Sequence, residues 1–242
     1  MPRHIFNPKT DKPFKLSRSK LELFMRCPKC FYLDVSHGIK QPGGLPFTLN
    51  SAVDELMKKE FDIHRAKGVA HPLMKAYKIK AVPFDNENMD DWRNWRRGIQ
   101  YYHKPTNLII YGAIDDIWLN SKGELMIVDY KSTSINREVT LEDEWKIGYK
   151  RQVEIYQWLF RKNGFKVSDM GYFVYANGRK DKKAFDAKLE FDVTVLPYKG
   201  SDKWVTKAIK DAHKTLMLDK MPKSAKGCEF CVYRSKVKRV EK

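Results

Sequence analysis

Two aspartates and a lysine stand in neighbouring segments that are rich in β-forming residues. Asp115 ends the run Gly112-Ala113-Ile114-Asp115, and Asp129 and Lys131 follow the apolar run Met126-Ile127-Val128. Side chains alternate between the two faces of a strand, so Asp129 and Lys131 should share one face. Clustered carboxylates repel each other unless a cation lies between them, and hard oxygen ligands suit Mg²⁺ or Mn²⁺. The pattern therefore predicts a divalent-metal site.

Such a site has the groups that phosphodiester hydrolysis requires. A bound metal lowers the pKa of a water ligand and polarises a phosphoryl oxygen. A lysine beside it can orient the attacking water and offset the charge on the pentavalent phosphate. The alternative is an ordinary surface hairpin, because Asp-x-Lys occurs often by chance. The Gly-x-x-Asp strand, a hairpin's length before Asp129, favours the metal site.

All four cysteines fall in two Cys-x-x-Cys pairs, Cys27 with Cys30 and Cys228 with Cys231. Two such pairs can supply four thiolates to one tetrahedral metal site. The distance between them along the chain is far too long for a compact zinc ribbon. A shared site would instead pin the C-terminal tail to the N-terminal helix as a clasp. Four free thiols are the alternative.

The charge of the chain indicates a polyanionic partner. Lys and Arg number 47 against 30 Asp and Glu, a net charge of +17. Such a charge attracts nucleic acid, although it also aids solubility. Trp and Tyr among the basic residues favour nucleic acid. Residues that could contact its backbone are Arg93, Arg96, Arg97, Lys146, Lys150 and Arg151.

Localisation follows from what the sequence lacks. No apolar run approaches the ~20 residues that cross a bilayer, and the N-terminus is polar and basic without a signal-peptide stretch. We expect a cytoplasmic protein with no membrane partner. In that compartment the cysteines should be metal ligands or thiols rather than disulfides.

The predicted elements alternate between helices and strands. After an irregular arm over 1–16, we expect a helix capped by Ser17 or Ser19 and a helix capped by Thr48. Between 68 and 88 the chain reads as a loop. The other expected elements are a helix over 89–102, strands over 107–119 and 124–131 joined by a turn at 120–123, a helix over 142–162, strands over 170–176 and 188–195, and a helix over 202–219.

This order predicts an α/β fold with a mixed sheet flanked by helices. We expect one domain over 17–234, including the cysteine clasp, and a basic tail over 235–242. The length of 242 residues suits one large domain.

Three motifs together resemble a known family. They are the Gly-x-x-Asp strand, the strand ending in Val-Asp-Tyr-Lys-Ser, and the helix with Gln152-Val153-Glu154-Ile155-Tyr156. The family is the RecB-like branch of the PD-(D/E)XK nucleases, which includes CRISPR-associated exonucleases. The resemblance implies a restriction-endonuclease-like core. It also implies that Asp115, Asp129 and the Tyr130 carbonyl bind metal, that Lys131 is catalytic, and that Gln152 and Tyr156 position the active-site groups and the DNA strand.

One position departs from the family. Many relatives carry a metal-binding histidine in an early helix, after Gly-x-x-x. Here the run is Asn50-Ser51-Ala52-Val53-Asp54, so Asp54 stands where the histidine is expected. Aspartate also binds Mg²⁺ or Mn²⁺. Glu55 is a weaker alternative because it points to another helical face, and an exposed acidic residue without a role is the third possibility.

The resemblance also bears on the cysteines. Relatives often bind a 4Fe–4S cluster through one N-terminal and three C-terminal cysteines. Cys27, Cys228 and Cys231 match three of these positions, whereas Val237 lies near the fourth. Cys30 can replace the missing ligand. The metal stays open between a 4Fe–4S cluster and Zn²⁺, with the cluster preferred.

We therefore predict a Mg²⁺- or Mn²⁺-dependent nuclease that hydrolyses DNA phosphodiester bonds, as an exonuclease of repair, recombination or defence. The resemblance implies a helicase or recombination protein as partner. Two alternatives are a nucleic-acid-binding subunit without catalysis and a structural subunit with a degenerate site. The first alternative would use the basic surface and a zinc clasp as a structural metal site, and the second is supported by the missing histidine.

Overall fold

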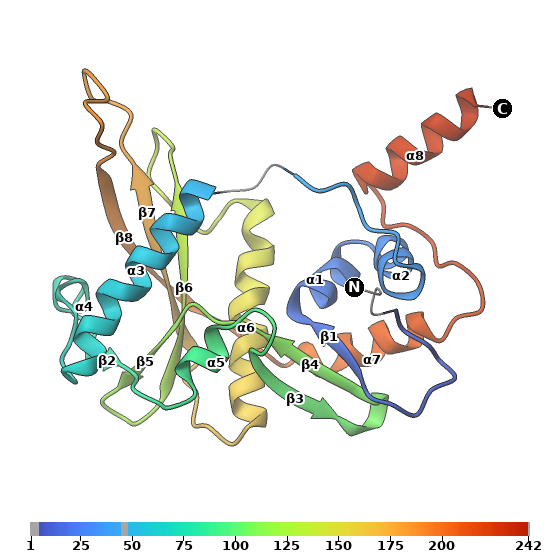
Figure 1. Cartoon of the computed structure of the whole chain (residues 1–242), viewed down its shortest axis with the longest axis horizontal. Coiled ribbons are helices and arrows are strands. Elements are labelled where there is room, and N and C mark those ends of the chain that lie inside the picture. Colours follow the sequence, from blue (N-terminus) through green and yellow to red (C-terminus); the bar gives the residue numbers. More distant parts are fainter. Residues whose placement is uncertain (1–4, 45–47, 242) are drawn as a thin grey trace. The chain divides into compact units, whose positions relative to one another are not determined.

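The computed structural model describes residues 5–44 and 48–241. The chain divides into two compact units, each drawn in Figure 1. Unit 1 takes the described residues of 1–45, 100–111 and 203–242, and unit 2 those of 46–99 and 112–202. Both units combine sheet and helix, so the predicted mixed α/β fold is confirmed. The boundaries of one domain over 17–234 stay a prediction.

Unit 1 is built on a three-stranded sheet. Its strands are β1 (Phe14–Ser17), β3 (Ile99–His103) and β4 (Leu108–Gly112), in the order β1-β4-β3, and β1 runs parallel to β4. Apolar side chains at every second position of β1 and β4 are buried. The arm predicted as irregular therefore ends earlier, because pairing with β4 makes its last residues a strand.

Five helical segments belong to unit 1: α1 (Arg18–Arg26), α2 (Pro28–His37), η1 (Lys104–Thr106), α7 (Val205–Leu216) and α8 (Glu229–Val240). The Ser17 hydroxyl accepts from the Lys20 amide at 3.3 Å, so Ser17 caps α1 as predicted. We did not predict α2, which starts at a proline suited to a first helical turn. Nor did we predict that the basic tail is helical.

Unit 2 contains a five-stranded mixed sheet with the order β2-β5-β6-β7-β8. The strands are β2 (Ala81–Pro83), β5 (Asp116–Asn120), β6 (Leu125–Thr133), β7 (Met170–Gly178) and β8 (Phe191–Lys199). Only β6 and β7 pair in parallel within this sheet. The predicted hairpin turn is confirmed: Asn120 Oδ1 accepts from the Lys122 and Glu124 amides, both at 2.9 Å, and Gly123 has φ +70°.

Helices cover both faces of this sheet. They are α3 (Thr48–Ala66), α4 (Pro72–Ala76), α5 (Met89–Arg93), η2 (Glu144–Lys146) and α6 (Ile147–Lys162). Phe61 of α3 packs on one face, in an apolar cluster with Trp118, Val128 and Tyr130. Val153 of α6 packs on the other face at Gly171, where a Cβ would collide with it. The alternation of β6 therefore turns Val128 and Tyr130 toward α3 and Asp129 and Lys131 toward α6.

Two predicted elements were wrong. The expected helix over 89–102 ends at Arg93, where the Asn94 side chain accepts from the Arg96 amide at 2.9 Å. Gly98, at φ +60°, then lies against the Gly112 carbonyl, and the chain continues as β3. The expected strand over 107–119 is two strands, β4 and β5, that belong to different sheets.

The segment over 68–88, expected to be a loop, contains α4 and β2. Both are short, and β2 forms only because it pairs with β5. No helix among the described residues combines the length and apolarity needed to cross a membrane.

Candidate active site and cysteine site

The break between β4 and β5 carries Asp115. Its side chain was expected late in a strand, but it lies in a bend directly before β5. The Tyr130 amide donates to Asp115 Oδ2 at 3.0 Å. Because Tyr130 follows Asp129 in β6, this bond ties Asp115 to the strand segment that presents Asp129 and Lys131. The structure thus brings these three predicted residues together.

Lys131 forms an ion pair with the buried carboxylate of Asp129. Its Nζ also lies 4.7 Å from the centre of the Tyr149 ring, on α6. Burial acts to lower the pKa of Lys131, but the charges of Asp129 and Asp115 outweigh burial and raise it. Lys131 is therefore held as an ammonium ion.

Asp54 reaches the same cluster from α3. Lys58, one helical turn later, places its Nζ 2.7 Å from Asp54 Oδ2 and 3.4 Å from Asp115 Oδ1. Burial and the Asp115 charge raise the pKa of Asp54 despite Lys58, so the carboxylates lie within each other's fields. The alternative residue, Glu55, is exposed and pairs with Lys59 at 2.7 Å.

Lys58 is a site residue that the sequence analysis missed. The available signal was its i, i+4 spacing from Asp54, which places both side chains on one helical face. Its half-buried ammonium bridges Asp54 and Asp115. Burial acts to lower the pKa of Lys58, but the Asp115 and Asp54 carboxylates raise it overall.

A buried ion cluster fixes the backbone on both sides of Asp115. Arg93 Nε donates to the Asp115 carbonyl at 2.9 Å, and Arg93 Nη2 lies 3.1 Å from Asp116 Oδ1. Asp116 is fully buried, pairs with Arg65, and accepts from the Tyr130 hydroxyl at 2.6 Å. The prediction that Arg93 contacts nucleic acid is therefore wrong, because its guanidinium is committed to this cluster.

Lys146 likewise cannot contact the backbone of a nucleic acid. Its side chain is buried, pairs with Asp143 at 3.0 Å and donates to the Thr140 carbonyl. In the sequence, the basic residues of predicted helices look alike. The prediction therefore could not separate the buried Arg93 and Lys146 from the exposed Arg96 and Arg97.

Gln152 and Tyr156 are both buried on α6, one turn apart. The Tyr156 hydroxyl donates to the Ala113 carbonyl, two residues before Asp115. Tyr156 thereby anchors α6 to the bend that carries the aspartate. The predicted role of the pair in holding a DNA strand stays a prediction.

The four cysteines meet in unit 1. Among the described residues they are the only group of three or more potential ligands with all ligand atoms within 4.8 Å of one another. The Sγ–Sγ distances are 3.5 Å for Cys30–Cys231, 3.6 Å for Cys30–Cys228 and 3.8 Å for Cys27–Cys231. The clasp between the N- and C-terminal segments is confirmed as an arrangement of residues.

The environment of Cys27 favours its thiolate. Burial raises the pKa of this thiol, but hydrogen bonds from the Ala225 and Cys30 backbone and from neighbouring thiols outweigh burial. The net effect lowers the pKa to about 7. The Ala225 amide lies 3.5 Å from Cys27 Sγ.

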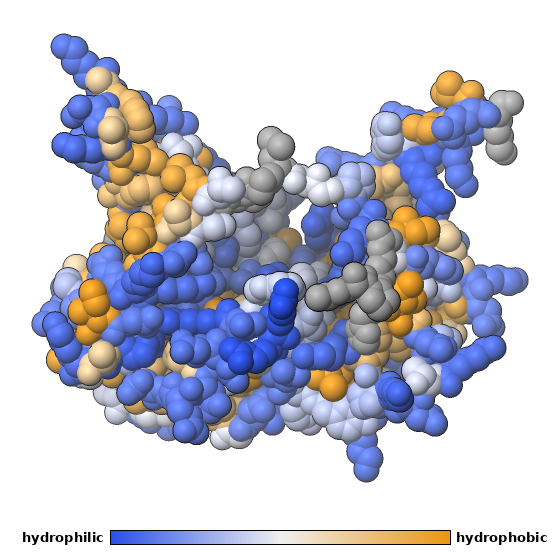
Figure 2. Space-filling view, viewed as in Figure 1, coloured by the Kyte–Doolittle hydropathy of each residue, from blue (hydrophilic) through white to orange (hydrophobic). Residues whose placement is uncertain are grey.

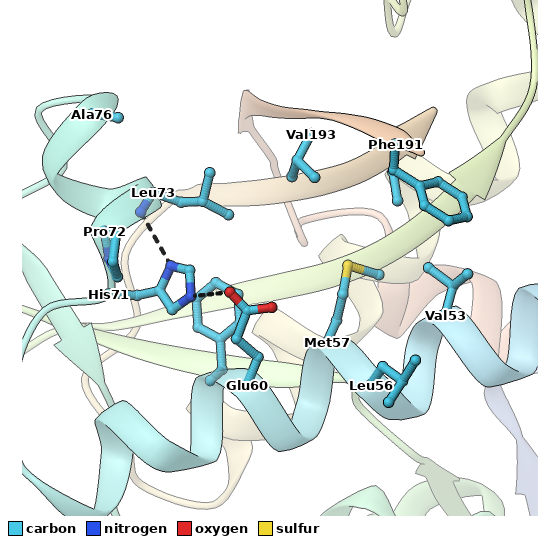
Figure 3. A pocket seen from close by; sticks show the side chains of 12 residues that line it. Val53, Leu56, Met57, Glu60, His71, Pro72, Leu73, Ala76, Phe191 and Val193 are labelled. Atoms are coloured by element: carbon cyan, nitrogen blue, oxygen red, sulfur yellow. Dashed lines mark hydrogen bonds and ion pairs between the residues drawn. The ribbon is translucent and has the colours of Figure 1, made fainter. Parts of the chain in front are cut away.

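Another side of α3 forms an apolar pocket of about 480 Å³ with α4, β7 and β8. Figure 3 shows Val53, Leu56 and Met57 along it, with His71 between Glu60 and the Leu73 amide. Figure 2 shows an apolar patch over β7 and β8 next to α3. None of the carboxylates or lysines of the active-site cluster lines the pocket.

Comparison with known proteins defines the class. Residues 47–236 match the PD-(D/E)XK nuclease superfamily, and the chain belongs to it. No curated protein matches. A solved structure titled "Crystal structure of SSO0001" is similar at 17% identity, covering 96% of this chain and 87% of that one, with a TM-score of 0.38.

Proposed function

We propose that this superfamily member is a Mg²⁺- or Mn²⁺-dependent deoxyribonuclease whose active site comprises Asp54, Asp115, Asp129 and Lys131. The observation that carries the proposal is the joint placement of Asp115, Asp129 and Lys131. The Tyr130 amide holds Asp115 beside the middle of β6, where Asp129 pairs with Lys131. The superfamily match spans all four residues.

The donor atoms at the site are of the kind that a hard divalent cation binds. Carboxylate oxygens of Asp54, Asp115 and Asp129 and the Tyr130 carbonyl would hold it, since Mg²⁺ and Mn²⁺ prefer oxygen ligands. When bound, the metal supplies an acidified water and a polarised phosphoryl oxygen. Lys131 keeps its proton, so it stabilises negative charge on the phosphate and orients the attacking water.

We propose DNA as the substrate and an exonuclease role in repair, recombination or defence, with a helicase or recombination protein as partner. The net charge of +17 supports a polyanionic substrate. The RecB-like branch is compatible with the early helix, in which Asp54 takes the place of the histidine. The alternative, a nucleic-acid-binding subunit without catalysis, needs the same basic surface and no metal at the aspartates.

We further propose that the cysteine site holds zinc and not the 4Fe–4S cluster. A tetrahedron of thiolates around one ion with Zn–S bonds of ~2.3 Å has S–S edges of about 3.8 Å. The observed separations of 3.5, 3.6 and 3.8 Å fit that size. A cluster binds each thiolate to a different iron and so holds the four sulfurs further apart.

Cleavage assays of three variants test the catalytic site. Asp129→Asn and Lys131→Met should each lower kcat by ~10²-fold or more, because each removes charge that acts on the reacting phosphate. Asp54→Ala should raise the Mg²⁺ concentration needed for half-maximal rate. DNA affinity in EDTA should change little. The assay uses end-labelled single-stranded, duplex and end-blocked DNA.

Asp85→Asn is the matched control because Asp85 is an exposed aspartate of the same unit. Near-normal cleavage by Asp129→Asn would overturn the catalytic assignment. A wild-type chain that binds DNA but cleaves none of the substrates with either metal would establish the binding-subunit alternative.

A further inference from the structure

A largely exposed tryptophan stands two ring contacts from the catalytic lysine. Trp145, in η2, is 63% exposed. Its ring meets the Tyr149 ring edge to face, with centroids 5.5 Å apart and planes at 79°. The Tyr149 ring in turn lies 4.7 Å from Lys131 Nζ. These three side chains form a continuous path from solvent to the reacting phosphate that the proposed function places at Lys131.

The backbone under Trp145 is firmly anchored. The next residue, Lys146, is buried and pairs with Asp143 at 3.0 Å. Its Nζ lies 5.1 Å from the centre of the Trp145 ring and 5.4 Å from that of the Tyr175 ring. Because η2 continues directly into α6, the exposed indole lies where the backbone enters a long helix.

A buried hydroxyl beside the same path lacks a partner. Tyr175 lies opposite Lys131 in the β6–β7 register, and its side chain is 3% exposed. Its hydroxyl has no hydrogen-bond partner among the described residues. A buried hydroxyl without a partner costs free energy, and a water molecule or a ligand group beside Asp129 and Lys131 would supply the bond.

We propose that Trp145 and Tyr149 form a stacking platform for a base of an unpaired strand, which selects single-stranded or frayed DNA ends as the substrate. An unpaired base can offer a free face to the indole without the cost of breaking a base pair. The two ring contacts place Trp145 at most about 10 Å from Lys131 Nζ. That separation corresponds to about three nucleotides at the ~3.4 Å rise of a stacked strand.

A nucleobase suits this surface better than a protein side chain would. Lys131 lies beyond Tyr149, and its positive charge attracts the phosphates that flank a base. The proposal rests on the proposed function for its place next to the reaction, but its binding test does not require cleavage.

The experiment compares Trp145→Ala with Trp145→Phe and with Trp95→Ala. Trp95 is a second exposed tryptophan of unit 2, at 72%, and its ring contacts Arg96. The affinity of each protein for a labelled single-stranded oligonucleotide is measured in EDTA, and KM and kcat are measured with Mg²⁺. Trp145→Ala should weaken single-strand binding and raise KM by about 5- to 150-fold, the usual effect of losing one stacked base. Its kcat should fall much less, and Trp145→Phe should recover most of the affinity.

Abasic nucleotides identify the stacked position. Placed one at a time from the strand end, an abasic nucleotide should weaken binding to the wild type at one position, and at that position Trp145→Ala should show no further loss. Blunt duplexes with cross-linked ends should bind both proteins equally. The platform proposal is wrong if Trp145→Ala and Trp95→Ala bind single strands equally well. It is also wrong if Trp145→Phe binds them no better than Trp145→Ala.

The two proposals fail separately. If no substrate is cleaved but the abasic effect disappears in Trp145→Ala, the platform stands and the nuclease proposal is wrong. If cleavage proceeds with an unchanged KM in Trp145→Ala, the nuclease proposal stands and the platform is wrong. Circular dichroism and Tm show whether Trp145→Ala is folded, and Trp145→Phe, which keeps a ring against Tyr149, carries the test if it is not.

Discussion

Lysines and aspartates alternate through the candidate active site, and each lysine contacts a carboxylate. Lys58 bridges Asp54 and Asp115, and Lys131 pairs with Asp129. In both lysines the carboxylates outweigh burial and raise the pKa. Both lysines therefore place a positive charge against the carboxylates of the candidate site.

The ion cluster behind Asp115 predicts how stability depends on pH. Asp62 accepts from Arg93 at 2.7 Å and from Arg65 at 2.9 Å. Burial raises the pKa of Asp62, but the two arginines outweigh it, so the pKa falls below the ordinary value of 3.8. A lowered carboxyl pKa contributes stability that is present above pH 3.8 and lost as the pH falls through the folded-state pKa.

The wild type should accordingly be more stable than Asp62→Asn at pH 7, and the difference should shrink toward zero below pH 3.8. Denaturant titrations at steps from pH 7 to pH 3 measure it, with Asp85→Asn as the control at an exposed site. A stability difference that stays constant over this range would show that the Asp62 charge makes no contribution.

At the scale of elements, α6 supports the bend that carries Asp115. Tyr156→Phe removes the hydrogen bond to the Ala113 carbonyl and should cost about 1 kcal/mol of stability. The freed bend should also lower kcat, while DNA affinity stays near the wild-type value. Denaturation and a separate determination of kcat and KM check both effects.

Tyr198→Phe is the matched control for this prediction. The Tyr198 hydroxyl donates to Glu154 Oε1 on the same helix at 2.7 Å, but it does not contact the bend. It should lose similar stability without the fall in kcat. If both variants lower kcat equally, Tyr156 acts through the general packing of α6 and not through Asp115.

The elements that sequence predicted well are those specified by local signals. The β5–β6 hairpin depends on Asn120 and Gly123, and α6 on its own periodicity. The errors arose where a distant partner decides the structure. Met89 to Tyr102 has helical spacing, yet its second half becomes β3 because it pairs with β4. The sequence indicates only that Asp116 belongs to a strand. Its ion pairs with Arg65 and Arg93 are visible only in the folded structure.

The same distinction holds for the site. The two-residue period of β6 and the doubled Cys-x-x-Cys spacing were visible in sequence, so Asp129, Lys131 and the cysteines could be selected. Lys58 and Arg93 could not, because a lysine or arginine on a helix shows its partner only after folding. Asp115 was selected correctly but assigned to a strand, since nothing local marks the change of sheet after Gly112.

At the scale of the whole molecule, the two candidate sites belong to different compact units. The carboxylates and Lys131 belong to unit 2, and the four cysteines belong to unit 1. The cysteines come from α2 and its start and from α8 and its start, so a metal there joins the two ends of the chain. A structural metal contributes directly to folding because the unfolded chain offers no preformed site.

Loss of the metal should therefore release α8 first. Cys228→Ser should abolish stoichiometric zinc binding, lower Tm, and expose the chain beyond about residue 220 to protease, since α8 buries none of its residues. Val232→Ser, on the exposed side of the same helix, is the control and should retain zinc.

Elemental analysis of anaerobically purified protein should find one zinc per chain and no iron, in a colourless solution. Iron together with the broad visible absorption of a cluster would show that the site holds 4Fe–4S and not zinc. If the protein contains neither metal and Cys228→Ser leaves Tm unchanged, the clasp proposal is wrong.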